Sequence, residues 1–436
     1  MITEIFHKKR ENFSYGVAKQ TLRIYIKMQT IIQHKDKLKK MASSEEKISP
    51  RKDGVLKGRR LELFHHDSLK EWGGETNQTD SFAVLHPLKR KRKQGLYVVL
   101  HSAGHDLYSC IGCTSYKGNH DIYHTPEDLF GLYLDCRAHE AQDFWWGGIN
   151  AKGEGAPERK ETLQSVEKRI LATVRWVIAN YSIDPQRVYL CGNSMGGSGA
   201  LGIGMCRGDL FAAVKVNVPA GVEHMLDRCV RSTGNIPDPP VCINYSAQND
   251  IWSQGHEKFY KTMREQKYAL YGYWADFGHA NNDAVMLEKN DLIHSFDWLS
   301  LVRDQAYPVF TNGECDTPNP WENPQDKVPV SGQVNAFFRW KNGRDLSDCL
   351  TMKLYLLSPS ELSTSFTMPE QARVDVSFRR LQQFKVLPGE KICYAFGEEK
   401  GVVEADGKGV VTLKQLLLTR DKKTVKLTRF KERKMK

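Results

Sequence analysis

Residues 187–201 read Arg187-Val188-Tyr189-Leu190-Cys191-Gly192-Asn193-Ser194-Met195-Gly196-Gly197-Ser198-Gly199-Ala200-Leu201. The first five residues form an apolar run typical of a buried strand, and the last five are small residues that suit a closely packed helix. Gly192 and Gly196 flank Ser194 in the turn between them. A nucleophile elbow requires this pattern, because side chains at the flanking positions would collide with the neighbouring strand and helix. We therefore expect the Ser194 hydroxyl to lie above the sheet edge, at the N-terminus of the next helix.

Strand-like and helical segments alternate on both sides of this turn. Helical spacing from Leu163 to Ile178 predicts an amphipathic helix, and apolar runs predict strands at 60–64, 81–85, 96–100, 132–135, 212–218, 241–245 and 269–274. Such alternation indicates an α/β domain with a mostly parallel sheet. The basic run at 88–93 resembles a nuclear localisation signal, but its place between two strands favours a solvated hairpin tip.

The C-terminal third has a different pattern. Residues 306–330 are rich in Pro, Asn, Asp and Gly and are predicted as a linker. Beyond them, short strands are predicted at 335–340, 351–356, 373–378, 391–396, 410–418 and 424–428, a number and length typical of an Ig-like or fibronectin-like sandwich. The predicted organisation is a basic mobile arm at 1–50, an α/β-hydrolase catalytic domain at 55–305, the linker, and an all-β sandwich at 331–430.

The positive charge lies at the two ends of the chain. Of the formal net charge of +11, residues 1–60 contribute a surplus of ten positive charges and residues 421–436 a surplus of six, which leaves −5 on residues 61–420. A mildly acidic body argues against a nucleic-acid-binding face. No apolar run approaches the ~18 residues of a membrane span.

Most of the ten cysteines stand alone beside apolar neighbours, as reduced buried cysteines do. The N-terminal forty residues have no uninterrupted apolar core, so they do not resemble a signal peptide. A cytoplasmic protein is favoured. Met28 and Met41 are each candidates for the true start, which would make the first segment dispensable. Secretion stays an alternative if the start site is misassigned. Nothing in the sequence indicates an oligomeric state.

A serine nucleophile needs a base, and the base needs an acid that holds its tautomer. In α/β-hydrolases the chain order is Ser, acid, His. Asp250 directly follows the predicted strand at 241–245, and His279 follows the strand at 269–274. His256 is a weaker candidate because it lies in a helical pattern. Asp276 and Asp283 lie too close to His279 in sequence to fit the usual acid loop.

The oxyanion hole needs two backbone donors. The amide of Met195, directly after the nucleophile, supplies one. The loop His101-Ser102-Ala103-Gly104 after the first central strand supplies the other, with Ala103 as the first choice and Ser102 as the alternative.

These motifs resemble the polyhydroxybutyrate-depolymerase and feruloyl/acetylxylan-esterase branch of the α/β-hydrolases, the family-one carbohydrate esterases. The resemblance rests on Leu100–Gly104, Ile183–Tyr189, Gly192–Gly197 and Gly278-His279. The chain departs from the family at Ser102, where Gly is usual, and at Ser246-Ala247 before the acid. The resemblance implies ester hydrolysis through an acyl-serine, with no metal and no organic cofactor.

Two further motifs have a structural and a functional interpretation. Trp145 and Trp146 lie in a loop on the active-site side and are candidates for stacking on a sugar or cinnamoyl ring, or else pack that loop onto the domain. Cys110 and Cys113, with His120 and His124, superficially resemble a zinc ligand set, but the spacing is short, and packing or a local disulfide is favoured.

Together these observations predict a serine esterase that removes an acetyl or feruloyl group from a carbohydrate, with a small ester or acylated carbohydrate as its partner and neither nucleic acid nor membrane. A serine peptidase of the prolyl-oligopeptidase kind is one alternative, although the N-terminal ~90 residues are too short for a propeller. A catalytically silent glycan-binding protein is the other.

Overall fold

The computed structural model of the 436-residue chain describes residues 48, 50–67, 72, 79–115, 118–136, 144–145, 165–222, 238–279, 291–323, 331–362 and 367–430. Two predictions fall outside these residues: nearly all of the basic arm at 1–50, and Trp146.

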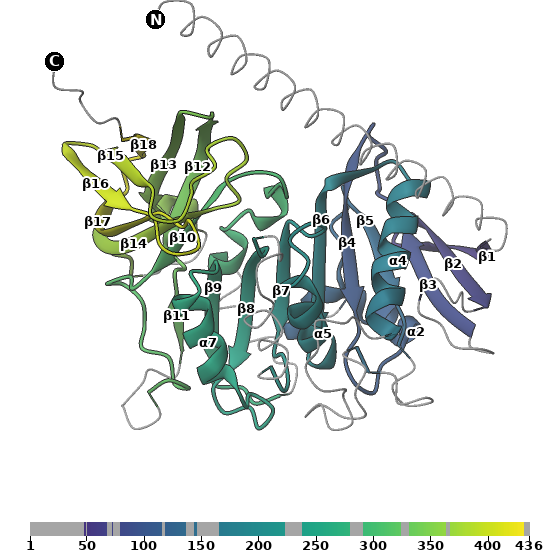
Figure 1. The fold of residues 1–436 in the computed structure, drawn as a ribbon. Helices are drawn as coiled ribbons and strands as arrows, with labels where there is room; N and C mark the ends of the chain where they lie inside the picture. The colour runs from purple at the N-terminus through teal and green to yellow at the C-terminus, as the bar shows by residue number, and fades with distance from the viewer. Residues whose placement is uncertain are drawn as a thin grey trace, which may run out of the picture.

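Ten of the described strands form one large sheet (Figure 1). Their order across the sheet is β1 (Pro50–Leu56), β2 (Arg59–Asp67), β3 (Thr79–Leu85), β5 (Phe130–Leu134), β4 (Gln94–Leu100), β6 (Ile183–Asn193), β7 (Ala213–Asn217), β8 (Val241–Ala247), β9 (Leu270–Ala275) and β11 (Gly332–Val334). Neighbours from β5 to β9 are parallel, whereas β1, β2, β3 and β11 pair antiparallel. The predicted α/β domain is therefore confirmed, with a mixed sheet whose central strands are parallel and whose outer strands are antiparallel.

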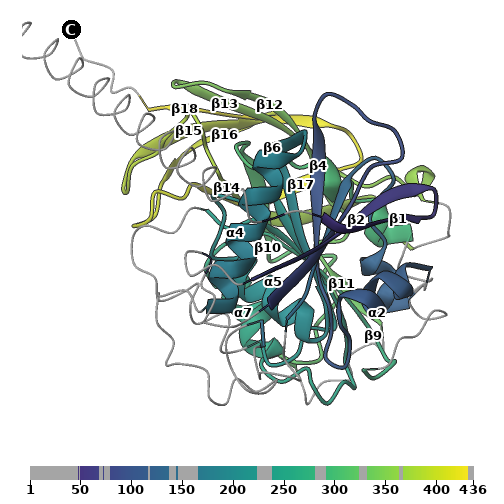
Figure 2. The same cartoon turned by 90° about the vertical axis from the view of Figure 1, so that its right-hand side faces the viewer.

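The central strands are buried on both faces, which explains their nearly continuous apolar sequences. Every residue of β4, β5, β7, β8 and β9 is buried. Helix α2 (Leu107–Gly112) packs on the face that carries Tyr97 and Val99. Helices α4 (Ser165–Asn180), α5 (Met195–Gly204) and α7 (His256–Glu265) pack on the opposite face, beside Val98. Figure 2 shows this layering, with α4 and α2 on opposite sides of the sheet.

The C-terminal part is an antiparallel β region beside the β9–β11 edge of the large sheet (Figure 1). One of its sheets has three strands, β10 (Tyr307–Thr311), β14 (Gln371–Arg379) and β17 (Thr412–Thr419). The other has five, in the order β12 (Phe338–Asp345), β13 (Cys349–Leu356), β18 (Lys423–Arg429), β15 (Lys391–Phe396) and β16 (Glu399–Glu404). Whether this region is Ig-like stays a prediction.

Short 3-10 helices fill several connections of the large sheet: η3 (Cys113–Ser115), η4 (Gly118–Tyr123) and η5 (Trp298–Ser300). A further one, η6 (Pro359–Glu361), follows β13. None of the helices in the described part of the chain has both the length and the apolar character of a membrane span.

The predicted hairpin tip at 88–93 is wrong in its topology. These residues are exposed, as expected, but β3 pairs with β5 and not with β4. Because β5 lies between β3 and β4, the segment is a crossover connection. Local sequence indicates where strands end. Which strands become neighbours depends here on β5, which begins thirty residues after the end of β4 and pairs with both β3 and β4.

Two strands occupy or adjoin the segment predicted as a linker. Strand β10 is buried and pairs with β14, while β11 pairs antiparallel with the edge strand β9. The Pro, Asn and Gly residues that surround them obscure the short apolar run Tyr307–Phe310 in the sequence pattern. The chain between the two parts is therefore structured at both of its ends.

Candidate active site

Ser194 occupies the sharp turn between β6 and α5. Its backbone angles, φ 53° and ψ −117°, lie in a region that residues other than glycine rarely adopt. The flanking glycines make this turn possible. A Cβ on Gly192 would lie 2.1 Å from the Gly196 carbonyl oxygen, and a Cβ on Gly196 would lie 2.0 Å from the Leu100 carbonyl oxygen. The structure therefore has the sharp turn between a strand and a helix that the sequence predicts at Ser194.

A chain of hydrogen bonds connects Ser194 with the two partners expected from the sequence. Ser194 Oγ lies 2.7 Å from His279 Nε2, and His279 Nδ1 lies 2.7 Å from Asp250 Oδ2. Asp250 follows β8 and His279 follows β9, so parallel strands bring both side chains to one edge of the sheet. The Asp250 side chain is 1% exposed and that of His279 is 30% exposed. An imidazole in this position can take a proton from the serine while the buried carboxylate orients it.

Neighbouring groups hold the Asp250 carboxylate in place. Its second oxygen, Oδ1, accepts a hydrogen bond from the Trp252 amide at 2.8 Å. Ser253 Oγ donates to the Asp250 carbonyl at 2.7 Å. Asn249 Oδ1 accepts from the Gly278 amide at 2.6 Å, which connects the loop after β8 to the loop after β9. The acid and the histidine are therefore positioned together.

The other candidates for acid and base have different surroundings. His256 is fully buried, with Nδ1 donating to the Ser253 carbonyl and Nε2 accepting from Ser246 Oγ. Burial lowers the pKa of His256 to about 4, so it is neutral near pH 7. Asp276 is exposed, and Asp283 lies outside the described residues.

The loop after β4 lies directly beside the first turn of α5. The two backbones approach so closely that a Cβ on Gly196 would lie within 2.7 Å of backbone atoms of Leu100 and His101. Residues 102–105 form a tight turn in which the His105 amide donates to the Ser102 carbonyl at 3.2 Å, and Gly104 has the positive φ of 75° that the turn requires. Ala103 and Gly104 are the exposed residues of this turn, and Met195 is the first residue of α5.

Ser102 is held by Tyr123. The Ser102 amide donates to the Tyr123 hydroxyl at 3.1 Å, and the two hydroxyl groups are 2.7 Å apart. Because its amide already has an acceptor, Ser102 is the weaker of the two candidates for the second oxyanion donor. Ala103 stays the first choice.

Trp145 is packed inside the domain. The residue is fully buried, and its Nε1 donates to the His101 carbonyl at 2.9 Å. Its Cβ lies against the α5 backbone at Gly199, where an added Cβ would approach to 2.5 Å. In this position the indole has no exposed face for a substrate ring, and it supports the loop after β4 instead.

Two apolar residues beside the site were missed from the sequence. Ile251 and Trp252 directly follow Asp250, and they are 77% and 39% exposed. The Trp252 ring lies 6.2 Å from the His279 ring, measured between centroids. The signal that could have revealed them is their position in the loop directly after a predicted strand, since connecting loops run over the surface and often carry binding residues.

Cys110 and Cys113 lie in α2 and at the start of η3 as free, buried thiols. Burial raises the pKa of both. The local disulfide considered above is therefore not formed, and packing explains both residues.

Comparison with known proteins identifies the catalytic class. Residues 135–269 match the model of the Esterase family, described as "Putative esterase". The matched segment contains Ser194 and Asp250. No curated protein matches the chain. The resemblance to esterases of the α/β-hydrolase type is confirmed, and the protein is a serine carboxylic ester hydrolase.

Similar solved structures include several hydrolases. An S-formylglutathione hydrolase from Agrobacterium tumefaciens is 14% identical, with a TM-score of 0.41, over 58% of this chain and 98% of its own. An acetyl xylan esterase from Aspergillus awamori is 13% identical, with a TM-score of 0.38, over 52% of this chain and 97% of its own. A carboxylesterase from Bacillus cereus is 12% identical, with a TM-score of 0.35, over 50% of this chain and 95% of its own.

Proposed function

We propose that Ser194 is the nucleophile of this ester hydrolase. Its oxygen attacks the ester carbonyl while His279 takes the hydroxyl proton and Asp250 stabilises the resulting imidazolium. The amides of Met195 and Ala103 donate to the oxyanion of the tetrahedral intermediate. His279 then gives the proton to the departing alcohol, which leaves an acyl-serine. A water molecule then attacks the acyl-serine through the same steps, which releases the carboxylic acid and restores the Ser194 hydroxyl. No cofactor takes part.

One observation carries this proposal: the continuous hydrogen-bonded chain from Ser194 Oγ through His279 to Asp250, with both links at 2.7 Å. Each group comes from the carboxyl end of a different strand. The strained backbone of Ser194 supports the same conclusion, since such strain persists where the surrounding structure enforces it and is concentrated at active sites.

For the substrate, we propose an acylated carbohydrate that carries an acetyl or feruloyl ester. The support is the exposed Trp252 beside His279, because an aromatic face in that position can pack against a sugar ring or a cinnamoyl ring. Trp252 takes the role that the sequence suggested for Trp145. Ile251 extends the apolar surface next to it.

We also propose that the C-terminal region, predicted at 331–430, forms an Ig-like or fibronectin-like β-sandwich attached to the catalytic domain predicted at 55–305. Strand β10 (Tyr307–Thr311) belongs with this sandwich, and β11 (Gly332–Val334) belongs with the sheet of the catalytic domain. The three-stranded and five-stranded antiparallel sheets support this proposal. We propose no nucleic-acid or membrane partner, since the charge of the chain is concentrated near its ends.

The nucleophile is tested by Ser194→Ala, with hydrolysis of p-nitrophenyl acetate as the readout. We expect the variant to keep its circular dichroism spectrum and lose activity, and we expect Ser347→Ala, an exposed serine in the β12–β13 connection, to behave like wild type. Undiminished turnover by Ser194→Ala would refute the assignment. Activity on acetylated xylan, methyl ferulate and simple aryl esters then tests the substrate, and a preference for simple aryl esters alone would contradict a carbohydrate ester.

A further inference from the structure

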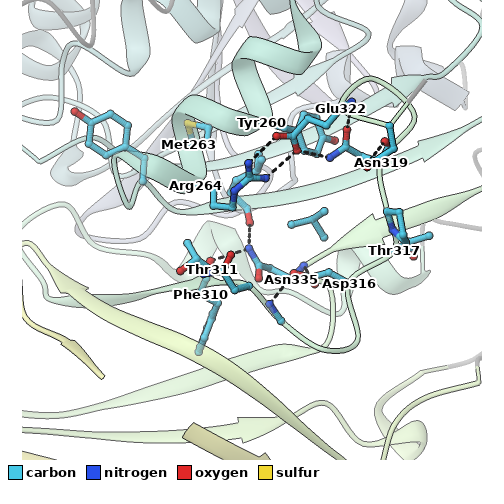
Figure 3. A pocket seen from close by; sticks show the side chains of 17 residues that line it. Tyr260, Met263, Arg264, Phe310, Thr311, Asp316, Thr317, Asn319, Glu322 and Asn335 are labelled. Carbon is cyan, nitrogen blue, oxygen red and sulfur yellow. Dashed lines mark hydrogen bonds and ion pairs between the residues drawn. The ribbon is translucent and has the colours of Figure 1, made fainter. Parts of the chain in front are cut away.

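A cavity lies away from the proposed nucleophile, where α7 meets the segment 310–323 and β11. Its volume is about 230 Å³, and none of Ser194, Asp250 and His279 lines it. In Figure 3, Arg264, Glu322 and Asn319 lie along one side of it, and Phe310, Thr311 and Asn335 lie along the other. Ligand pockets for drug-sized molecules measure ~300–1,000 Å³, so this cavity suits a smaller molecule.

One residue that lines this cavity, Asn335, has a buried polar atom without a hydrogen bond. Asn335 is 4% exposed, and its Nδ2 donates to the carbonyls of Leu270 at 2.9 Å and Phe310 at 3.0 Å. Since both of these partners are acceptors, the orientation of the amide is fixed. No donor among the described residues reaches its Oδ1. Buried polar groups are almost always satisfied, so this wall residue carries an acceptor that the described residues leave without a donor.

The charges around the cavity nearly cancel. Arg264 binds both carboxylate oxygens of Glu322, at 2.9 and 2.8 Å. The Asp316 carboxyl group accepts hydrogen bonds from the backbone amides of Asn335, at 2.7 Å, and Gly313, at 3.2 Å. Burial raises the pKa of Asp316 to about 7, so that much of it is uncharged near neutral pH. The site therefore has no excess of positive charge for an anion and little negative charge for a cation.

Both apolar and polar side chains line this cavity. Met263, Phe310 and Val334 supply apolar surface, and the Thr311 and Thr317 side chains supply hydroxyl groups. A molecule that both donates and accepts hydrogen bonds, and that has C–H surface between its hydroxyls, matches this lining. We propose that this cavity is a second, non-catalytic binding site for a neutral polyhydroxyl molecule about the size of one sugar ring.

Contacts lead from the cavity wall to the loop of Asp250. Trp321, which adjoins Glu322, stacks on Tyr260 at 5.5 Å and donates from Nε1 to Ser253 Oγ at 3.0 Å. Ser253 Oγ in turn donates to the Asp250 carbonyl. Because Trp321 lies beside the cavity, its fluorescence is a natural reporter of occupancy.

The test is titration of the full-length chain with D-xylose and D-glucose, followed by calorimetry and tryptophan fluorescence. We expect saturable binding of at least one of the two sugars. Val334→Trp fills the cavity and should weaken that binding at least tenfold, while Val402→Trp, on the exposed strand β16, should leave it unchanged. Thr311→Val, a nearly isosteric change, should weaken it about two- to fivefold and serves if Val334→Trp does not fold.

Three results would overturn the proposal. The first is the absence of saturable binding of either sugar by wild type. The second is undiminished binding by the folded Val334→Trp variant, or by Thr311→Val if Val334→Trp does not fold. The third comes from a cationic comparison. Ethanolamine hydrochloride is the cationic comparison, and tighter binding of ethanolamine than of either sugar would also contradict a neutral ligand. Hydrolysis of p-nitrophenyl acetate should persist in Val334→Trp, so failure here is distinguishable from failure of the proposed catalytic role of Ser194.

Discussion

His279 Nε2 lies 2.7 Å from Ser194 Oγ, although 85 residues separate the two in the chain. Parallel strands make this contact possible. Ser194 follows β6 and His279 follows β9, and the carboxyl ends of both strands lie at one edge of the sheet. The same edge carries Asp250, so the arrangement depends on the order of the strands and not on local sequence.

Replacing Asp250 with Asn tests the role of the acid. The change preserves the shape of the side chain but removes the charge that stabilises the imidazolium of His279. We expect kcat for p-nitrophenyl acetate to fall by a factor on the order of 10⁴. Asp276→Asn is the matched control because Asp276 is exposed in the next loop, and it should keep wild-type activity. If Asp276→Asn lost the activity and Asp250→Asn kept it, the acid would be misassigned.

Gly196→Ala tests the close approach of α5 to β4. The added methyl group would lie 2.0 Å from the Leu100 carbonyl oxygen, so the turn must shift. We expect a loss of about 1–3 kcal/mol in the free energy of unfolding, measured in urea, together with loss of hydrolysis. Gly112→Ala is the control, since a Cβ there meets no atom within 4 Å. Equal stability of the two variants would argue against the elbow geometry.

Trp252→Ala tests the proposed contact with the substrate. The ring lies beside His279 but belongs to no hydrogen bond of the proposed machinery through its side chain, so substrate binding should suffer more than the chemical step. An aromatic contact of about 1.4 kcal/mol corresponds to a tenfold higher KM for methyl ferulate, with a nearly unchanged kcat. Trp252→Phe should restore most of the loss. An unaltered KM in Trp252→Ala would remove Trp252 from the binding surface.

His256→Gln tests a pH effect on stability. The folded pKa of about 4 lies below the ordinary value of 6.5, so between these values the unfolded chain binds more protons than the folded one. The stability of the native protein should therefore decrease as the pH falls from 6.5 toward 4, with a contribution from His256 of at most about 3 kcal/mol. Urea unfolding across this range should show a flatter profile for the variant. Parallel profiles would mean that His256 is not buried in its neutral form.

Local sequence was enough to predict the turn at Ser194, the strand before it and the helix after it. The pattern at 187–201 combines an apolar run with Gly192 and Gly196, which each lie two residues from Ser194. No distant residue is needed to interpret it. The central strands follow from apolar runs, because strands buried on both faces are mostly apolar; Lys215 and Asn217 in β7 and Asn244 in β8 are buried exceptions.

Other features depend on contacts that sequence does not show. Strand β11 exists because it pairs with β9, and β10 because it pairs with β14. The prediction of a hairpin at 88–93 failed for the same reason. Trp145 and Trp252 are both tryptophans in loops, and only the packing shows that Trp145 is buried while Trp252 is exposed.

The most direct test of the central claim is covalent labelling with a fluorophosphonate, followed by peptide mapping. Such a probe reacts with a serine whose hydroxyl is activated by a base. We predict one labelled site, Ser194, and a loss of labelling in His279→Ala. Labelling of a different residue, or hydrolysis of p-nitrophenyl acetate that continues without any labelling of Ser194, would contradict the account.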